Sequence, residues 1–298
     1  MKKKTIGALI LTVGAAVTMA AAATPGAHSL LTKAAEHPVS GMTLAAEKFA
    51  SADPVAEKGV AEAIRQCMAK SGYDYTPVSA GQDSVDLKKA VGFDTLTVET
   101  ARATGYATFK PAGVHEPAEN SDLGKLMADP GFQQALHGGG SPEQNVVQSS
   151  AGTGMLWGGC KAEGITAVYG NADSYMRATA LALNSLMVAT NAASQDVGIE
   201  SAVNSWKECM STTAFPYSRP GEAASAGLDA GGQKELKIAV TDATCRENTG
   251  FDAKITSVLD KYLTTRMKEL EAEVADVKQI RHDASERAQL LLDQPAAG

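Results

Sequence analysis

The sequence lacks the short motifs that mark many catalytic and cofactor-binding centres. It contains no Gly-x-Ser-x-Gly, so the nucleophile elbow of serine hydrolases is absent. It contains no Cys-x-x-Cys and no His-x-x-x-His, the spacings typical of structural zinc sites. The glycine run at residues 138–140 is not followed by the Lys-Ser/Thr pair of a phosphate-binding loop, and no strand precedes it. We therefore expect neither a metal ion nor an organic cofactor.

Histidine is also scarce, with five residues in 298. Two of the five lie in residues 107–160, a stretch rich in Gly, Pro, Asn and Ser that also holds acidic residues. Loop histidines near acids are more often solvated surface groups than catalytic ones, although this stretch is where a hydrolytic site would have to form. The residues concerned are His115, His137, Glu116, Glu119 and Asp129.

Long apolar runs are confined to the first 23 residues. Three lysines at residues 2–4 precede an uncharged run from Thr5 to Ala23 with an apolar middle and four final alanines. This pattern predicts a secretory signal peptide over residues 1–23. An uncleaved membrane anchor is the competing interpretation, because the run is near the minimum length of a span. We expect cleavage near Ala23, which leaves 275 residues and no stable membrane anchor.

Positive charge is sparse beyond this leader. Once its three lysines are removed, 24 basic residues face 34 acidic ones, a net charge of −10. Contacts to phosphates need clustered Lys and Arg, so this balance argues against nucleic acid as a partner. The plain consequence of the charge is solubility.

Four cysteines stand in a repeated order of segments. Cys67-Met68 and Cys209-Met210 each begin a similar stretch, and each is followed downstream by one further cysteine, Cys160 or Cys245. Outside the cytoplasm, four widely spaced cysteines are more often disulfides than metal ligands. Three pairings are possible, and the repeat favours Cys67–Cys160 and Cys209–Cys245 because each bond would close its own unit.

Aromatic residues make up only 5% of the chain, and several of them follow the repeated cysteines. Aromatic side chains bury much area and can offer a polar group, so these are the best candidates for binding work. The alternative, which we favour, is that they pack around the two disulfides. The candidates are Tyr73, Tyr75, Trp206, Phe215 and Tyr217.

The periodicity of apolar residues predicts a mainly α fold, a disulfide-stapled helical domain with a long C-terminal helix. We expect a flexible linker over residues 24–53, in which residues 41–49 could form a frayed helix, and a helical domain over residues 54–265 with two cysteine-bearing units. Within this domain, residues 218–232 have the Ser, Gly and Ala content of a loop. Residues 266–298 form a C-terminal helical extension.

The tail carries an apolar seam in steps of four and three from Leu263 to Leu291, interrupted by Arg281. Glycine and proline are absent from residues 252–294, so the pattern predicts one unbroken helix over residues 255–292. Arg281 should weaken packing locally or reach an acid on the facing helix. The seam either packs on helices in residues 169–213 or forms a coiled coil with a protein partner or a second copy.

The order of segments resembles that of a group of secreted proteins of unknown function from Gram-positive bacteria of the actinobacterial type. The resemblance covers about residues 60–265, and Ala214 departs from it because the pattern has glycine there. It implies secretion and disulfides, and it implies no activity. The matching segments are Cys67-Met68…Gly72-Tyr73…Tyr75, Asp129-Pro130-Gly131-Phe132, Gly159-Cys160…Glu163…Tyr169-Gly170, Trp206…Cys209-Met210…Pro220 and Ala239…Asp242…Cys245…Thr249-Gly250.

Together these features predict a secreted, non-catalytic interaction or accessory protein that acts at the cell envelope or outside the cell. The competing hypothesis is a secreted hydrolase with a site in residues 107–160. Two or three acids or histidines converging in a deep cleft would favour the hydrolase.

Overall fold

The computed structural model of the chain describes residue 34 and residues 39–75, 77, 85–109, 122–139, 145–149 and 154–294. These residues are predominantly helical, which confirms the predicted fold class. One short antiparallel hairpin pairs strand β1 (Val146–Gln148) with strand β2 (Gly154–Leu156), with Val147 opposite Met155. No helix in the described part of the chain is both long and apolar enough to cross a membrane.

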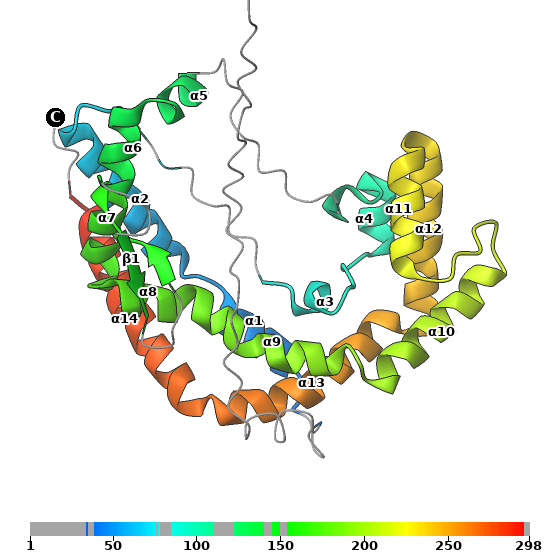
Figure 1. Ribbon diagram of the computed structural model, residues 1–298. Helices are drawn as coiled ribbons and strands as arrows, with labels where there is room; N and C mark the ends of the chain where they lie inside the picture. Colours follow the sequence, from blue (N-terminus) through cyan, green and yellow to red (C-terminus); the bar gives the residue numbers. More distant parts are fainter. Residues whose placement is uncertain are drawn as a thin grey trace, which may run out of the picture.

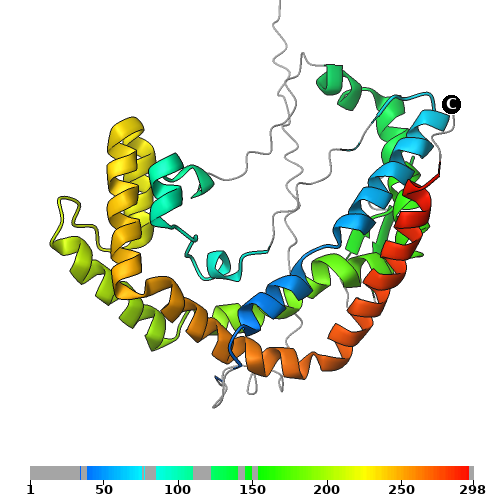
Figure 2. The ribbon, with the colours of Figure 1, turned by 180° about the vertical axis from the view of Figure 1, so that it is seen from behind.

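The helices form an arch with two arms that rise from a common base (Figures 1 and 2). Buried apolar side chains form two separate clusters, one in the first arm and one that runs through the base and the second arm. The base holds α1 (Met42–Ala50), α3 (Leu87–Ala90), α9 (Ala182–Ala193) and α13 (Phe251–Glu269). The first arm holds α2 (Pro54–Lys70), α5 (Asp122–Met127), α6 (Pro130–His137), α7 (Gly159–Tyr169), α8 (Ala172–Met176) and α14 (Glu271–Leu292). The second arm holds α4 (Val98–Thr104), the 3₁₀ turn η2 (Ala107–Phe109), α10 (Val197–Ser211), α11 (Pro220–Ala230) and α12 (Gly232–Thr249).

Short local signals set where several helices begin. The carboxylate of Asp53 accepts hydrogen bonds from the backbone N–H groups of Val55 and Ala56, both at 2.9 Å, and so caps α2. Asp129 caps α6 in the same way, and both helices have proline at their first position, where no N–H is needed. The aspartate cap and the proline together set where α2 and α6 begin.

Close helix packing holds the first arm together. A Cβ atom placed on Gly59 of α2 would lie 2.3 Å from the Cβ of Ala288, so glycine is what lets α2 and α14 approach each other there. The Cys67–Cys160 disulfide then ties α2 to α7.

The second arm is closed by the Cys209–Cys245 disulfide between α10 and α12, so both predicted pairings are confirmed. Their Cα–Cα distances are 5.4 Å in the first arm and 5.6 Å in the second. The two disulfides indicate an oxidising environment.

The loop expected over residues 218–232 is wrong, because α11 occupies most of it. Pro220 fits the first position of a helix, and the small residues that suggested a loop instead allow close packing. A Cβ atom on Gly227 would lie 2.5 Å from the ring of Tyr106. The small side chains of α11 therefore allow the ring of Tyr106 to pack closely against this helix.

The predicted flexible linker does not extend over α1. Thr43 and Phe49 of this helix are buried, and Asp260 of α13 accepts a 2.7 Å hydrogen bond from the backbone N–H of Thr43. The helix forms although it has few large apolar residues, because α1 packs against both α9 and α13. Most of residues 24–38, like the leader, lie outside the described residues.

The tail is two helices and not the single helix that we predicted. Helix α13 ends at Glu269, and α14 begins at Glu271. Leu270 between them has φ −91° and ψ 11°, and its side chain is buried. Because α13 packs on α1 and α9 in the base while α14 packs on α2 and α7 in the first arm, the chain must change direction between them (Figure 1).

The apolar seam of the tail is covered by the chain itself. Leu263, Val277, Ala284 and Ala288 are fully buried. Much of the cover comes from α2 and α7, in addition to the region that we expected to provide it. Arg281 forms no ion pair with an acid among the described residues and instead donates hydrogen bonds to the backbone carbonyl of Ala178, with its Nε at 3.0 Å.

Candidate functional site

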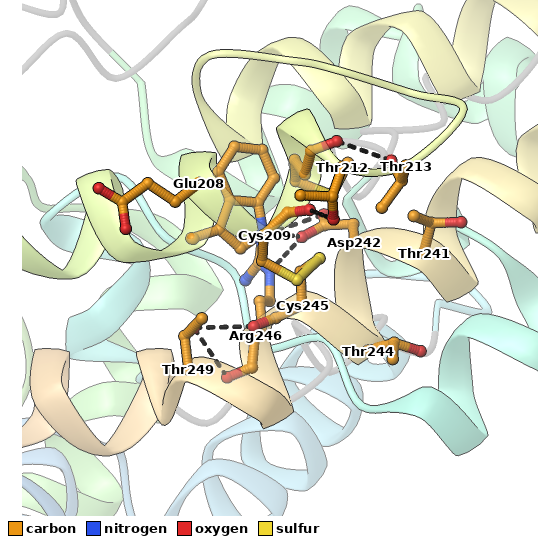
Figure 3. Close-up of a disulfide and its surroundings, with 12 residues drawn as sticks. Glu208, Cys209, Thr212, Thr213, Thr241, Asp242, Thr244, Cys245, Arg246 and Thr249 are labelled. Carbon is orange, nitrogen blue, oxygen red and sulfur yellow. Dashed lines mark hydrogen bonds and ion pairs between the residues drawn. A yellow bond between two sulfur atoms is a disulfide. The ribbon is translucent and has the colours of Figure 1, made fainter.

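The most polar part of the core lies beside the second disulfide (Figure 3). Asp242 of α12 is fully buried and accepts hydrogen bonds from Trp206 Nε1 at 2.9 Å and from the Tyr106 hydroxyl at 3.0 Å. Arg246, one turn further along α12, donates from Nε to the same carboxylate at 2.7 Å. Three elements distant in the sequence therefore meet at one buried carboxylate.

The guanidinium of Arg246 makes further contacts besides its ion pair with Asp242. It donates to the backbone carbonyl of Asp94 at 2.7 Å and lies over the rings of Phe251 and Phe109, at 5.3 Å and 6.0 Å from their centroids. Burial, and then the charge of Asp242, raise the pKa of Tyr106 far above its usual value. Because each charged group is hydrogen-bonded inside the core, this network acts as a structural tie and offers no group to a ligand.

The five candidate binding aromatics are split between the arms and pack inward. Tyr73 and Tyr75 meet the ring of Phe132 edge-on, at centroid distances of 5.4 Å and 5.1 Å, beside the first disulfide unit. Trp206 is 0% exposed, so it is a core residue and not part of a binding surface. The remaining two, Phe215 and Tyr217, are half-buried against the core of the second arm.

The described part of residues 107–160 does not bring the candidate hydrolytic residues together. Asp129 serves as the cap of α6 and also accepts a hydrogen bond from the Tyr73 hydroxyl at 3.3 Å. His137 lies at the other end of the same helix, and burial followed by the charge of Lys161 lowers its pKa. His115, Glu116 and Glu119 lie outside the described residues.

A second group of ionisable side chains is buried in the first arm. The hydroxyl of Tyr169 is buried and has no hydrogen-bond partner among the described residues. Its ring meets that of Tyr175 edge-on at 5.2 Å. Nearby, burial and then the charge of Asp53 raise the pKa of Glu57. The Tyr169 hydroxyl therefore lacks a described hydrogen-bond partner, whereas the polar groups around Asp242 are hydrogen-bonded to one another.

Three exposed or half-exposed side chains on α14 lie close enough together to be considered as metal ligands. Ligand atoms of His282, Asp283 and Glu286 lie within 4.8 Å of one another. All three come from one helix surface, and exposed acidic groups commonly cluster without an ion. We assign no metal site to them.

A pocket of about 500 Å³ lies where α14 leaves the base, and we call it the elbow pocket. One wall is the start of α14, and the other is a π-helical segment, η4 (Arg177–Leu181), with the first part of α9. Short π-helical segments occur frequently at functional sites. The pocket is lined by Arg177, Leu181, Asn184, Ser185, Ala272, Glu273 and Asp276.

The two walls of the elbow pocket are fixed in place. Arg177 and Asp276 form an ion pair across them. Arg266 of α13 donates to the backbone carbonyl of Ser185 at 2.7 Å, and Arg281 of α14 holds the carbonyl of Ala178 in the π-helical segment. Contacts of α13 and α14 with α9 and the π-helical segment before it therefore form the pocket.

Two polar side chains of the elbow pocket are not engaged. Neither the carboxylate of Glu273 nor the amide of Asn184 hydrogen-bonds or pairs with another described residue. Sequence reasoning missed the pocket because its walls lie about 90 residues apart in the chain. Nothing in either segment alone indicates that they face each other.

No protein-family model, curated protein or solved structure matches this chain.

Proposed function

We propose that this protein is exported and acts without catalysis, as an interaction or accessory protein at the cell envelope or outside the cell, and that it binds its partner at the elbow pocket. The single observation that carries the binding role is the contrast between the two polar regions described above. The carboxylate of Asp242 is fully engaged by donors of the chain, whereas the elbow pocket presents a carboxylate and an amide with no described partner.

Export is supported by the leader pattern of residues 1–23 and by the two disulfides. The volume of the pocket, about 500 Å³, lies within the range of natural ligand pockets. The resemblance to secreted Gram-positive proteins stays part of the proposal and agrees with export.

The test is capture of ligands from cell-envelope and secreted fractions on the purified, oxidised protein, with mass spectrometry of what is retained. Ala272→Trp places a large side chain at the wall of the elbow pocket, and Ala275→Trp places the same side chain on an exposed position of α14 outside it. We expect wild type and Ala275→Trp to retain the same molecules and Ala272→Trp to lose them.

Equal retention by both variants would contradict a role for the pocket. Turnover of ester, peptide or glycoside substrates by the purified protein would instead favour the hydrolase. Recovery of the full-length chain in the cytosolic fraction, with Met1 intact and free thiols, would contradict export.

A further inference from the structure

We propose that the elbow pocket binds a primary ammonium group carried on an aliphatic stem. This inference rests on the proposed function, which makes the pocket the binding site, and adds the chemical class of the ligand. It follows from the charge of the lining, from the hydrogen-bond acceptors left open there, and from the apolar side chains beside them.

The charge of the lining favours a monocation. Arg177 contributes one positive charge, and its ion pair with Asp276 offsets it. Glu273 then remains as a half-buried carboxylate with no described partner. A partly buried pair of opposite charges interacts more strongly than the same pair in water, because the surrounding dielectric constant is lower.

The open acceptors suit a group with several N–H donors. An ammonium has three N–H donors and no acceptor. Glu273 offers its carboxylate oxygens from α14, and Asn184 offers its amide oxygen from α9 on the opposite wall. A cation held between them would join the two walls by charge-assisted hydrogen bonds, which are about twice as strong as neutral ones.

The apolar part of the lining suits an aliphatic stem. Leu181 and Ala272 are the apolar side chains of the pocket, one on each wall. Long amine side chains commonly lay their methylene groups along apolar surface while the charged end reaches a polar partner. The ammonium group can come from a free amine or from a lysine side chain of a partner protein, and the experiment below separates these sources.

The binding test is an NMR titration of the oxidised full-length mature protein with pentylamine and, as a neutral match, 1-pentanol. We expect pentylamine to bind and to shift resonances of Asn184, Leu181 and Glu273, and 1-pentanol to bind at least tenfold more weakly because it lacks the charge. Glu273→Gln should weaken pentylamine binding by roughly tenfold or more. Glu271→Gln, the same charge change on an exposed position of the same helix, should leave it unchanged.

A second titration uses Nα-acetyl-lysine methylamide, which carries the ammonium on a protein-like backbone. Binding as tight as that of pentylamine, and lost with Glu273→Gln, points to a lysine of a partner protein. Binding of pentylamine alone points to a free amine, since the pocket then rejects the backbone. Both results support an ammonium site.

Equal binding of pentylamine and 1-pentanol would overturn the inference, as would equal effects of Glu273→Gln and Glu271→Gln or no binding of either amine. If the capture experiment with Ala272→Trp succeeds while the amines fail, only the ligand class is wrong. If both fail, the pocket is not the binding site.

Discussion

Replacing the buried carboxylate of Asp242 by an amide should strongly destabilise the protein. Asp242→Asn keeps the shape of the side chain and removes its charge. Arg246, which is 2% exposed, is then left without a counter-charge. Breaking a buried ion pair at one partner typically costs about 3–5 kcal/mol.

The hydrogen bonds of Asp242 support a loss of stability within this range of about 3–5 kcal/mol. Each oxygen of Asp242 accepts from Arg246 and from one other donor, either Trp206 Nε1 or the Tyr106 hydroxyl. An asparagine must therefore turn its NH₂ toward one pair of donors. The less costly orientation is toward Tyr106, whose hydroxyl can rotate and accept, but Arg246 still faces a donor. For a chain of this size, 3–5 kcal/mol corresponds to a decrease in Tm of roughly 6–20 °C.

The assay is chemical and thermal unfolding of the oxidised protein, followed by circular dichroism and tryptophan fluorescence. Glu247→Gln is the matched control, because Glu247 is exposed on the same helix. The double variant Asp242→Asn/Arg246→Gln should lose less stability than the sum of its single variants, because it leaves no unpaired charge. A loss for Asp242→Asn within 1 kcal/mol of the control would refute the structural role assigned to the network.

Two further comparisons use matched residues. Tyr169→Phe should raise the free energy of unfolding by about 1 kcal/mol, and Tyr106→Phe should lower it by about 1–3 kcal/mol. The difference is expected because only the Tyr106 hydroxyl has a described hydrogen-bond partner. Urea unfolding that shows the same sign for both variants would contradict this. The raised pKa of Glu57 means that its contribution to stability falls as pH rises above its usual pKa of 4.5, so Glu57→Gln should be more stable than wild type at neutral pH. The hydrogen bond from Arg65 lowers the pKa of Glu62, so this group stabilises the fold above pH 4.5 and loses that effect as pH falls. Glu62→Gln should therefore be less stable at neutral pH, and unfolding curves from pH 4 to 8 that shift equally for both variants would be evidence against these assignments.

Local and compositional signals were enough to establish the fold class, the disulfides and the points where α2 and α6 begin. These features depend on local or compositional signals: proline after an aspartate cap at Asp53 and Asp129, the repeated Cys-Met segments, and the apolar period of the tail. The disulfide pairing followed from the order of segments, because each bond closes one structural unit.

Other features depend on what a segment packs against, and these became visible only in the three-dimensional structure. The small residues after Pro220 have the composition of a loop, yet they form a helix, and the lack of a side chain at Gly227 leaves room for the ring of Tyr106. Leu270 carries no helix-breaking side chain, yet the helix ends there because the base and the first arm lie in different directions.

The elbow pocket shows the same dependence most clearly. Arg177 and Asp276 lie about 100 residues apart, and only the turn between α13 and α14 brings them together. Periodicity reports which face of a helix is apolar, but it carries no information on which distant helix faces the polar residues beside that face. The contact between the two walls is set by the packing of the whole arch, so no local pattern of the sequence could predict it.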